Sequence, residues 1–172
     1  MDYNWQDVYV GILGAEVDGI QYYFIDNESY FTGSKVYTDD ARYEIERFGF
    51  FSKALLSALP LLGFKPDLIH CHDWQTGLVP VYLKERFAGS DFFRGIKTVM
   101  TIHNLKFQGR WGVEEVKHIT GLSDYYFTSD KLEYYEDANL LKGGIVFADA
   151  VTTVSNTYAE EIKTEQYGEG LH

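Results

Sequence analysis

The sequence has 172 residues, of which 45% are hydrophobic and 17% aromatic, and this is enough for one globular domain with a substantial core. Its 26 acidic and 15 basic residues give a formal net charge of -11, which repels a phosphate backbone or an anionic lipid surface, so we expect neither nucleic acid nor a membrane as a partner. A single cysteine, Cys71, excludes an intramolecular disulfide, and the absence of a signal-peptide pattern predicts a cytoplasmic location.

The first part of the chain predicts a hairpin followed by a long helix. Val8–Leu13 and Ile20–Ile25 are rich in β-forming residues, and Asp18-Gly19 favours a tight turn between them. From Ala41 to Leu59 the apolar residues recur every three to four positions, as in a helix that packs on a core. Pro60 and Gly63 are expected to end that helix.

The second part alternates strands and helices. The expected order is strand Asp67–Ile69, helix Thr76–Phe87, strand Thr98–Ile102, a long irregular stretch, helix Asn139–Phe147 and strand Ala150–Val154. A last helix begins near Thr157, where Thr157 and Glu160 form a capping-box pattern. This alternation predicts an α/β fold with a parallel, doubly wound sheet.

Polar side chains follow two strands of this predicted sheet. His70, His72 and Asp73 come after the first strand, and His103 and Asn104 follow the next one. Because ligands of open parallel sheets bind beyond the carboxyl ends of the strands, we expect these side chains to share one ligand site.

Two other interpretations apply to the first group. The pair His70 and His72 lies on an extended segment, so both rings point to one face and could chelate a metal. The carboxylate that follows does not have the spacing of metallo-hydrolases, and we predict no metal. Asp73 is also well placed to cap the helix that opens near Thr76.

Two further motifs favour structural roles. Cys71 lies between two histidines, but no oxyanion loop of the Gly-x-Ser-x-Gly type is present, which argues against a cysteine enzyme. Lys142-Gly143-Gly144 lies inside a helical pattern, so its glycines indicate close helix packing and not a phosphate loop. Lys142 is then expected at solvent or at a domain face.

Several segments resemble the bacterial glycogen synthases and plant starch synthases, which are retaining glucosyltransferases of the GT-B fold. These segments are Tyr23–Glu28, Lys65–Pro80, Thr101–Gly109 and Asn139–Ser155. The resemblance implies an incomplete N-terminal half of that fold over residues 1–172, a Rossmann-like parallel sheet with flanking helices and an added β-hairpin. It also implies that the nucleotide-binding Lys-x-Gly-Gly segment and the C-terminal donor domain are absent from this sequence.

The resemblance further implies an activity and its residues. The intact enzyme would transfer glucose from ADP-glucose to the non-reducing end of an α-1,4-glucan with retention of configuration, without metal or cofactor, and this chain alone would be inactive. His103 corresponds to the histidine beside the transferred glucose, and Asp73 to a carboxylate that faces the same subsite. Asn104, Tyr37 and Trp74 are the expected substrate-binding residues, with Tyr37 on the acceptor side.

Two other functions remain open at this point. One is a different GT-B glycosyltransferase, such as one of the sucrose-synthase type, and the other is a non-catalytic module for glucan binding or subunit docking. An exposed sheet edge and an exposed cleft would also favour self-association of such a truncated domain.

Overall fold

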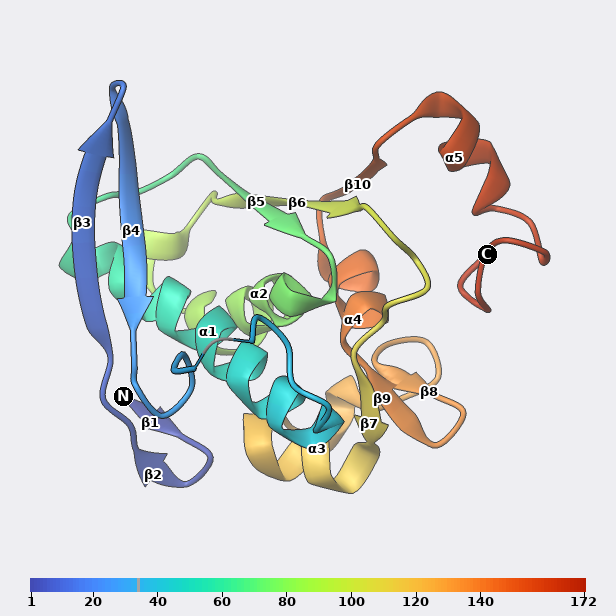
Figure 1. The fold of residues 1–172 in the computed structure, drawn as a ribbon, viewed down its shortest axis with the longest axis horizontal. Coiled ribbons are helices and arrows are strands. Elements are labelled where there is room, and N and C mark those ends of the chain that lie inside the picture. The colour runs from blue at the N-terminus through green and yellow to red at the C-terminus, as the bar shows by residue number, and fades with distance from the viewer. Residues whose placement is uncertain (34) are drawn as a thin grey trace.

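A parallel sheet lies over a layer of helices in the computed structural model, which describes residues 1–33 and 35–172 (Figure 1). The sheet has the order β10-β6-β5, with every neighbouring pair parallel. Its strands are β5 (Leu68–His72), β6 (Lys97–Ile102) and β10 (Ala150–Thr153). The predicted parallel α/β architecture is therefore confirmed.

Strand β5 has one buried and one exposed face. Ile69 and Cys71 point into the core, whereas Leu68, His70 and His72 alternate with them and are exposed. The strand is longer than expected, so both histidines lie within it and do not follow it. Helices α1 (Ala41–Leu61), α2 (Leu78–Tyr82) and α4 (Leu140–Phe147) lie on the buried side of the sheet (Figure 1).

The core under the sheet is built from apolar residues of all these elements. Its most deeply buried members include Cys71, Leu78, Val79, Val81, Tyr82, Met100, Leu140 and Leu141. Residues of α2 are apolar on every side because α1, α4 and the sheet surround this helix. The short helix continues into a π-helical turn, Leu83–Phe87, and a 3₁₀ turn, Trp74–Thr76, precedes it.

Glycines bring α2 and α4 into close contact. A Cβ atom at Gly77 would overlap the carbonyl group of Leu140, and one at Gly144 would lie 3.0 Å from the Cα of Gly77. The glycines of the Lys142-Gly143-Gly144 motif therefore allow helix packing, as predicted. Lys142 itself is half-buried, and its Nζ donates to the backbone carbonyls of Ser129 at 2.6 Å and Glu133 at 2.5 Å.

The chain begins with two antiparallel hairpins. A short one joins β1 (Asp2–Tyr3) to β2 (Gln6–Asp7), and the long predicted one joins β3 (Gly11–Val17) to β4 (Ile20–Asp26). Positive φ angles of 52° at Asp18 and 78° at Gly19 match the tight turn that the sequence predicted. The first strand of this hairpin begins three residues later than expected.

Helix α1 is capped by Asp40, whose side chain accepts a hydrogen bond from the backbone N–H of Tyr43 at 3.0 Å. The helix runs to Leu61, one residue past Pro60, so its predicted end at Pro60 and Gly63 is confirmed to within one turn. Pro60 lies in the last turn, where only one intrahelical donor is lost. The chain leaves the helix at Gly63, which has a φ of 63°.

The stretch between β6 and α4 is not irregular as predicted. It contains α3 (Val113–Thr120) and a small antiparallel sheet of β7 (Arg110–Gly112), β9 (Asp137–Asn139) and β8 (Glu133–Tyr134). Strands of two or three residues are too short to show a period in the sequence. Helix α5 (Asn156–Glu161) forms near its expected position.

The cap of α5 differs from the predicted capping box. Ser155, and not Thr157, accepts the backbone N–H of Tyr158 with its Oγ at 3.1 Å. Among the helices of residues 1–33 and 35–172, none combines the length and the apolar character needed to cross a bilayer.

We expect Gly77→Ala to lower the free energy of unfolding by about 2 kcal/mol or more, because the added methyl would force α2 away from α4. Gly89→Ala is the matched control, since nothing lies within 4 Å of a Cβ built there. It should change stability by less than about 0.5 kcal/mol. Urea unfolding followed by circular dichroism measures both, and equal effects would contradict the close helix contact.

We also expect the thiol of Cys71 to be inert in the folded chain. Burial raises its pKa to about 12, so almost no thiolate exists near neutral pH. Labelling by an aromatic disulfide reagent at pH 8 should be at least ~100-fold slower than for a free thiol and should become fast in denaturant. Fast labelling of the native chain would mean that β5 does not bury this side chain.

Candidate active-site cleft

Asp73 connects the ends of β5 and β6. Its backbone N–H donates to the carbonyl of Thr101 at 3.0 Å, which extends the parallel pairing by one residue. Its carboxylate Oδ1 accepts the backbone N–H of His103 at 2.7 Å and, more weakly, that of Asn104 at 3.4 Å. The side chain makes no helix-cap hydrogen bond, so the interpretation of Asp73 as a cap of the following helix is wrong.

The backbone of Asp73 is strained. It has a φ of 55° and a ψ of -171°, in a region that residues with a side chain rarely occupy. Such a conformation costs on the order of 1–3 kcal/mol and persists where the surrounding contacts impose it. Here the hydrogen bonds to Thr101 and His103 impose it, and the carboxylate is turned back across the end of β6.

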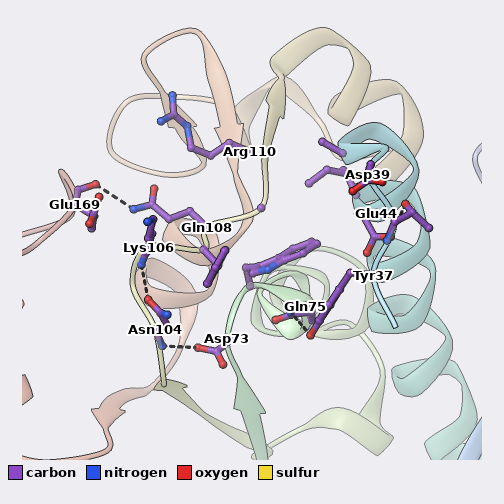
Figure 2. A pocket seen from close by; sticks show the side chains of 16 residues that line it. Tyr37, Asp39, Glu44, Asp73, Gln75, Asn104, Lys106, Gln108, Arg110 and Glu169 are labelled. Carbon is purple, nitrogen blue, oxygen red and sulfur yellow. Dashed lines mark hydrogen bonds between the residues drawn. The ribbon is translucent and has the colours of Figure 1, made fainter. Parts of the chain in front are cut away.

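A cleft of about 750 Å³ opens beside this carboxylate. Four parts of the chain line it: the first turns of α1 with the residues just before them, the residues after β5, the residues after β6, and Glu169 (Figure 2). The predicted site residues Tyr37, Asp73, Trp74 and Asn104 all line it. The structure therefore brings together four predicted residues that are up to 67 positions apart (104 − 37).

His103 differs from the other predicted site residues, because its ring does not line this cleft. The backbone N–H of His103 is held by Asp73, while its ring Nε2 lies 3.0 Å from Nδ1 of His72. The rings of His70 and His72 share one face of β5, as predicted, with centroids 4.2 Å apart. Within the described part of the chain, no three His, Cys, Asp or Glu side chains are grouped to hold a metal ion.

Trp74 lines the cleft but is almost entirely buried. Its indole is only 9% exposed and packs edge-on against the ring of Phe48, with centroids 5.1 Å apart. Gly109, with a φ of 63°, crosses the indole so closely that a Cβ atom would overlap it. Trp74 is therefore mainly a packing residue that presents one edge to the cleft.

Tyr37 stands on the opposite wall and is held by several polar contacts. Gln75 donates from Nε2 to the Tyr37 hydroxyl at 3.0 Å (Figure 2). The neighbouring Thr38 donates to Glu44 Oε1 from its backbone N–H at 2.9 Å and from its hydroxyl at 2.8 Å. Arg47 then donates to Glu44 Oε2 at 2.6 Å, so a buried ion pair anchors the loop that carries Tyr37.

The electrostatic character of the cleft is mildly acidic. Of the described residues that line it, four carry a carboxylate and two a cationic side chain: Asp39, Glu44, Asp73, Glu169, Lys106 and Arg110. Arg110 is already paired with Asp137 at 3.1 Å. The amide side chains of Gln75, Asn104 and Gln108 add neutral donors and acceptors, which suit sugar hydroxyl groups better than a diphosphate.

Several lining residues were not predicted from the sequence. Lys106, Phe107 and Gln108 lie within a segment that resembles the synthases, so that resemblance was the available signal. Glu44 lies within α1, and the helical spacing of apolar residues there gives no sign of a site. Glu169 carries no local signal, and it reaches the cleft because its backbone carbonyl accepts Nε2 of Gln108 at 3.0 Å (Figure 2).

Known proteins similar to this chain belong to one family. The family model for the starch synthase catalytic domain matches residues 1–172. The glycogen synthase of Lachnospira eligens is 66% identical over 171 residues, which are 99% of this chain and 36% of that protein. The glycogen synthase of Lachnoclostridium phytofermentans is 60% identical over 171 residues, again 99% of this chain and 36% of that protein.

A solved structure is similar as well. The catalytic domain of Starch Synthase IV from Arabidopsis thaliana bound to ADP and acarbose matches with a TM-score of 0.86 and 34% sequence identity. The match covers 95% of this chain and 34% of that chain. The fold described above is therefore part of the starch synthase catalytic fold, and the chain belongs to the starch synthase catalytic domain family.

Proposed function

We propose that this chain forms one wall of the active-site cleft of a glycogen synthase. The whole enzyme would transfer glucose from ADP-glucose to the non-reducing end of an α-1,4-glucan with retention of configuration. The observation that carries the proposal is the carboxylate of Asp73, which two strand ends hold at the edge of a cleft rich in amide and hydroxyl groups. The Arabidopsis relative, bound to ADP and acarbose, supports a nucleotide sugar and a glucan as ligands.

In this proposal Asp73 stabilises the reacting sugar. Retaining transfer passes through an oxocarbenium-like state, in which positive charge develops at the anomeric carbon. A fixed carboxylate beside that carbon stabilises the charge without having to reorganise, because its position is already set by the backbone of His103. The same hydrogen bond fixes the backbone of His103, whose ring does not line the cleft formed by the described residues. In this proposal His103 meets the transferred glucose where the remaining part of the enzyme completes the subsite.

The other site residues bind hydroxyl groups. Asn104 Oδ1 accepts the backbone N–H of Lys106 at 3.1 Å, which leaves its Nδ2 to donate to the sugar. The Tyr37 hydroxyl accepts from Gln75 and so keeps its own hydrogen for the acceptor glucan. Trp74 contributes an apolar edge on which a sugar ring can pack.

The donor diphosphate is held mainly by residues outside 1–172 in this proposal. The cleft has more carboxylates than cations, and a diphosphate requires the reverse. The chain spans 36% of the length of its glycogen synthase relatives, so most of their residues lie outside this segment. We therefore assign the acceptor side and the glucose subsite to this chain.

We expect purified residues 1–172 to show no transfer of radiolabelled glucose from ADP-glucose to glycogen. A longer protein that contains this segment and the remaining length of its relatives should be active, and it should prefer ADP-glucose over UDP-glucose. Filter-bound radioactivity measures both. Turnover by the pure chain would contradict the proposal that residues outside 1–172 bind the donor diphosphate. An inactive longer protein that binds glycogen would favour a non-catalytic glucan-binding module.

In the active longer protein, we expect His103→Ala to lower kcat by at least about tenfold, or ~1.4 kcal/mol of transition-state stabilisation. Asp73→Asn keeps an acceptor for the backbone of His103 but removes the charge, and should lower kcat by about 100-fold. Asp91→Asn removes an exposed carboxylate outside the cleft and serves as the control. An unchanged kcat for Asp73→Asn, with native circular dichroism, would remove Asp73 from the reaction.

A further inference from the structure

The side chains of His72 and His103 form a hydrogen bond between two imidazole rings. Nδ1 of His72, the last residue of β5, lies 3.0 Å from Nε2 of His103, which directly follows β6. The ring centroids are 5.2 Å apart with an interplanar angle of 47°. The contact spans two neighbouring strands, so the parallel pairing of β5 with β6 sets its geometry.

This contact restricts where protons reside. One of the two facing nitrogens must donate and the other must accept, so the bond contains one proton and excludes a second. Nε2 of His103 is thereby occupied. Nδ1 of His103 forms no hydrogen bond within residues 1–33 and 35–172, and it is the ring nitrogen that remains for a ligand.

The surroundings favour the neutral form of His72. Partial desolvation, together with the nearby rings of His70 and His103, lowers the pKa of His72, while the carboxylate of Asp73 acts in the opposite direction. The lowered pKa means that the His72 ring takes up a second proton only below its usual range, so its neutral form, which the hydrogen bond to His103 requires, is favoured.

His70 lies on the same face of β5 as His72 but makes different contacts. Its Nε2 lies 2.6 Å from the hydroxyl of Thr101, which in turn lies 2.7 Å from the hydroxyl of Thr152 on β10. This chain of hydrogen bonds crosses the sheet without reaching His103. The ring of His70 only borders that of His72, so His70 is a natural control for the loss of a histidine from this face of β5.

We propose that His72 is a positioning residue for His103. It holds the His103 ring in one orientation outside the cleft that the described residues line, and leaves Nδ1 for the sugar where the remaining part of the enzyme completes the glucose subsite. The inference rests on the proposed function, because the sugar is the ligand of that function. The hydrogen bond itself is independent of any activity. His72 is exposed and lies outside the cleft, so the proposal gives it no direct contact with substrate.

The hydrogen bond is tested by nuclear magnetic resonance on the 172-residue chain with ¹⁵N-labelled histidine. The chain has five histidines, so single substitutions assign the rings. We expect a nitrogen–nitrogen coupling between His72 and His103 across the hydrogen bond, and its loss in His72→Ala. In His70→Ala the coupling should persist. An absent coupling in the folded chain, or equal loss in both variants, would overturn the proposal.

The positioning role is tested in the longer enzyme with His72→Asn and His72→Gln, two amide side chains of similar size. The amide of Asn lies where Nδ1 of His72 lies, whereas the longer Gln places its amide where Nε2 lies. We expect His72→Gln and His72→Ala to lower kcat by about tenfold with little change in KM for glycogen, because the ring of His103 is misplaced. His72→Asn should remain within about threefold of the wild type.

The two tests distinguish the two ways to fail. If the longer protein is inactive in every form, the proposed function fails, and the coupling still decides whether His72 holds His103. If the wild type is active but His72→Gln and His72→Ala keep its kcat, the positioning role is wrong and the proposed function stands. A kcat that falls equally in His72→Asn and His72→Gln would also overturn positioning through Nδ1.

Discussion

The carboxylate of Asp73 accepts the backbone N–H of His103, and this single contact determines where the residues after β5 and β6 lie. It requires the unusual backbone conformation of Asp73, because only a positive φ turns the side chain back across the end of β6. The same hydrogen bond fixes the first residue of the segment 103–110, most of which lines the cleft. That segment can approach the indole of Trp74 only because residue 109 is glycine.

Two other features of the fold hold the residues around the Asp73–His103 hydrogen bond in place. Close packing of α2 against α4, which Gly77 and Gly144 allow, fixes the position of the helix after Asp73 beneath the sheet. The buried pair of Glu44 and Arg47 fixes the opposite wall and the loop of Tyr37. A site built between strand ends and a buried ion pair needs little rearrangement to bind a ligand, which favours a preorganised cleft.

The candidate site was only partly predictable. Asp73, Trp74, Asn104 and Tyr37 follow from strand ends and from the resemblance to the synthases, and all four line the cleft. The ring of His103 was expected there too, but it turns toward His72. Gln75 and Glu169 were missed because neither a glutamine after a strand nor a glutamate near a chain end is typical of a site.

The family followed from the motifs that resemble the synthases, whereas the parallel sheet, the long hairpin and the helix that begins at Ala41 were predictable because local periodicity and turn residues encode them. Two contacts of the site are visible only in the folded chain: Asp73 accepts a hydrogen bond from a backbone N–H 30 residues away, and the ring of His72 pairs with that of His103 across 31 residues. The physical reason is strand register. Which side chains meet depends on how β5 and β6 align and on the φ of one residue, and neither quantity leaves a period in the sequence.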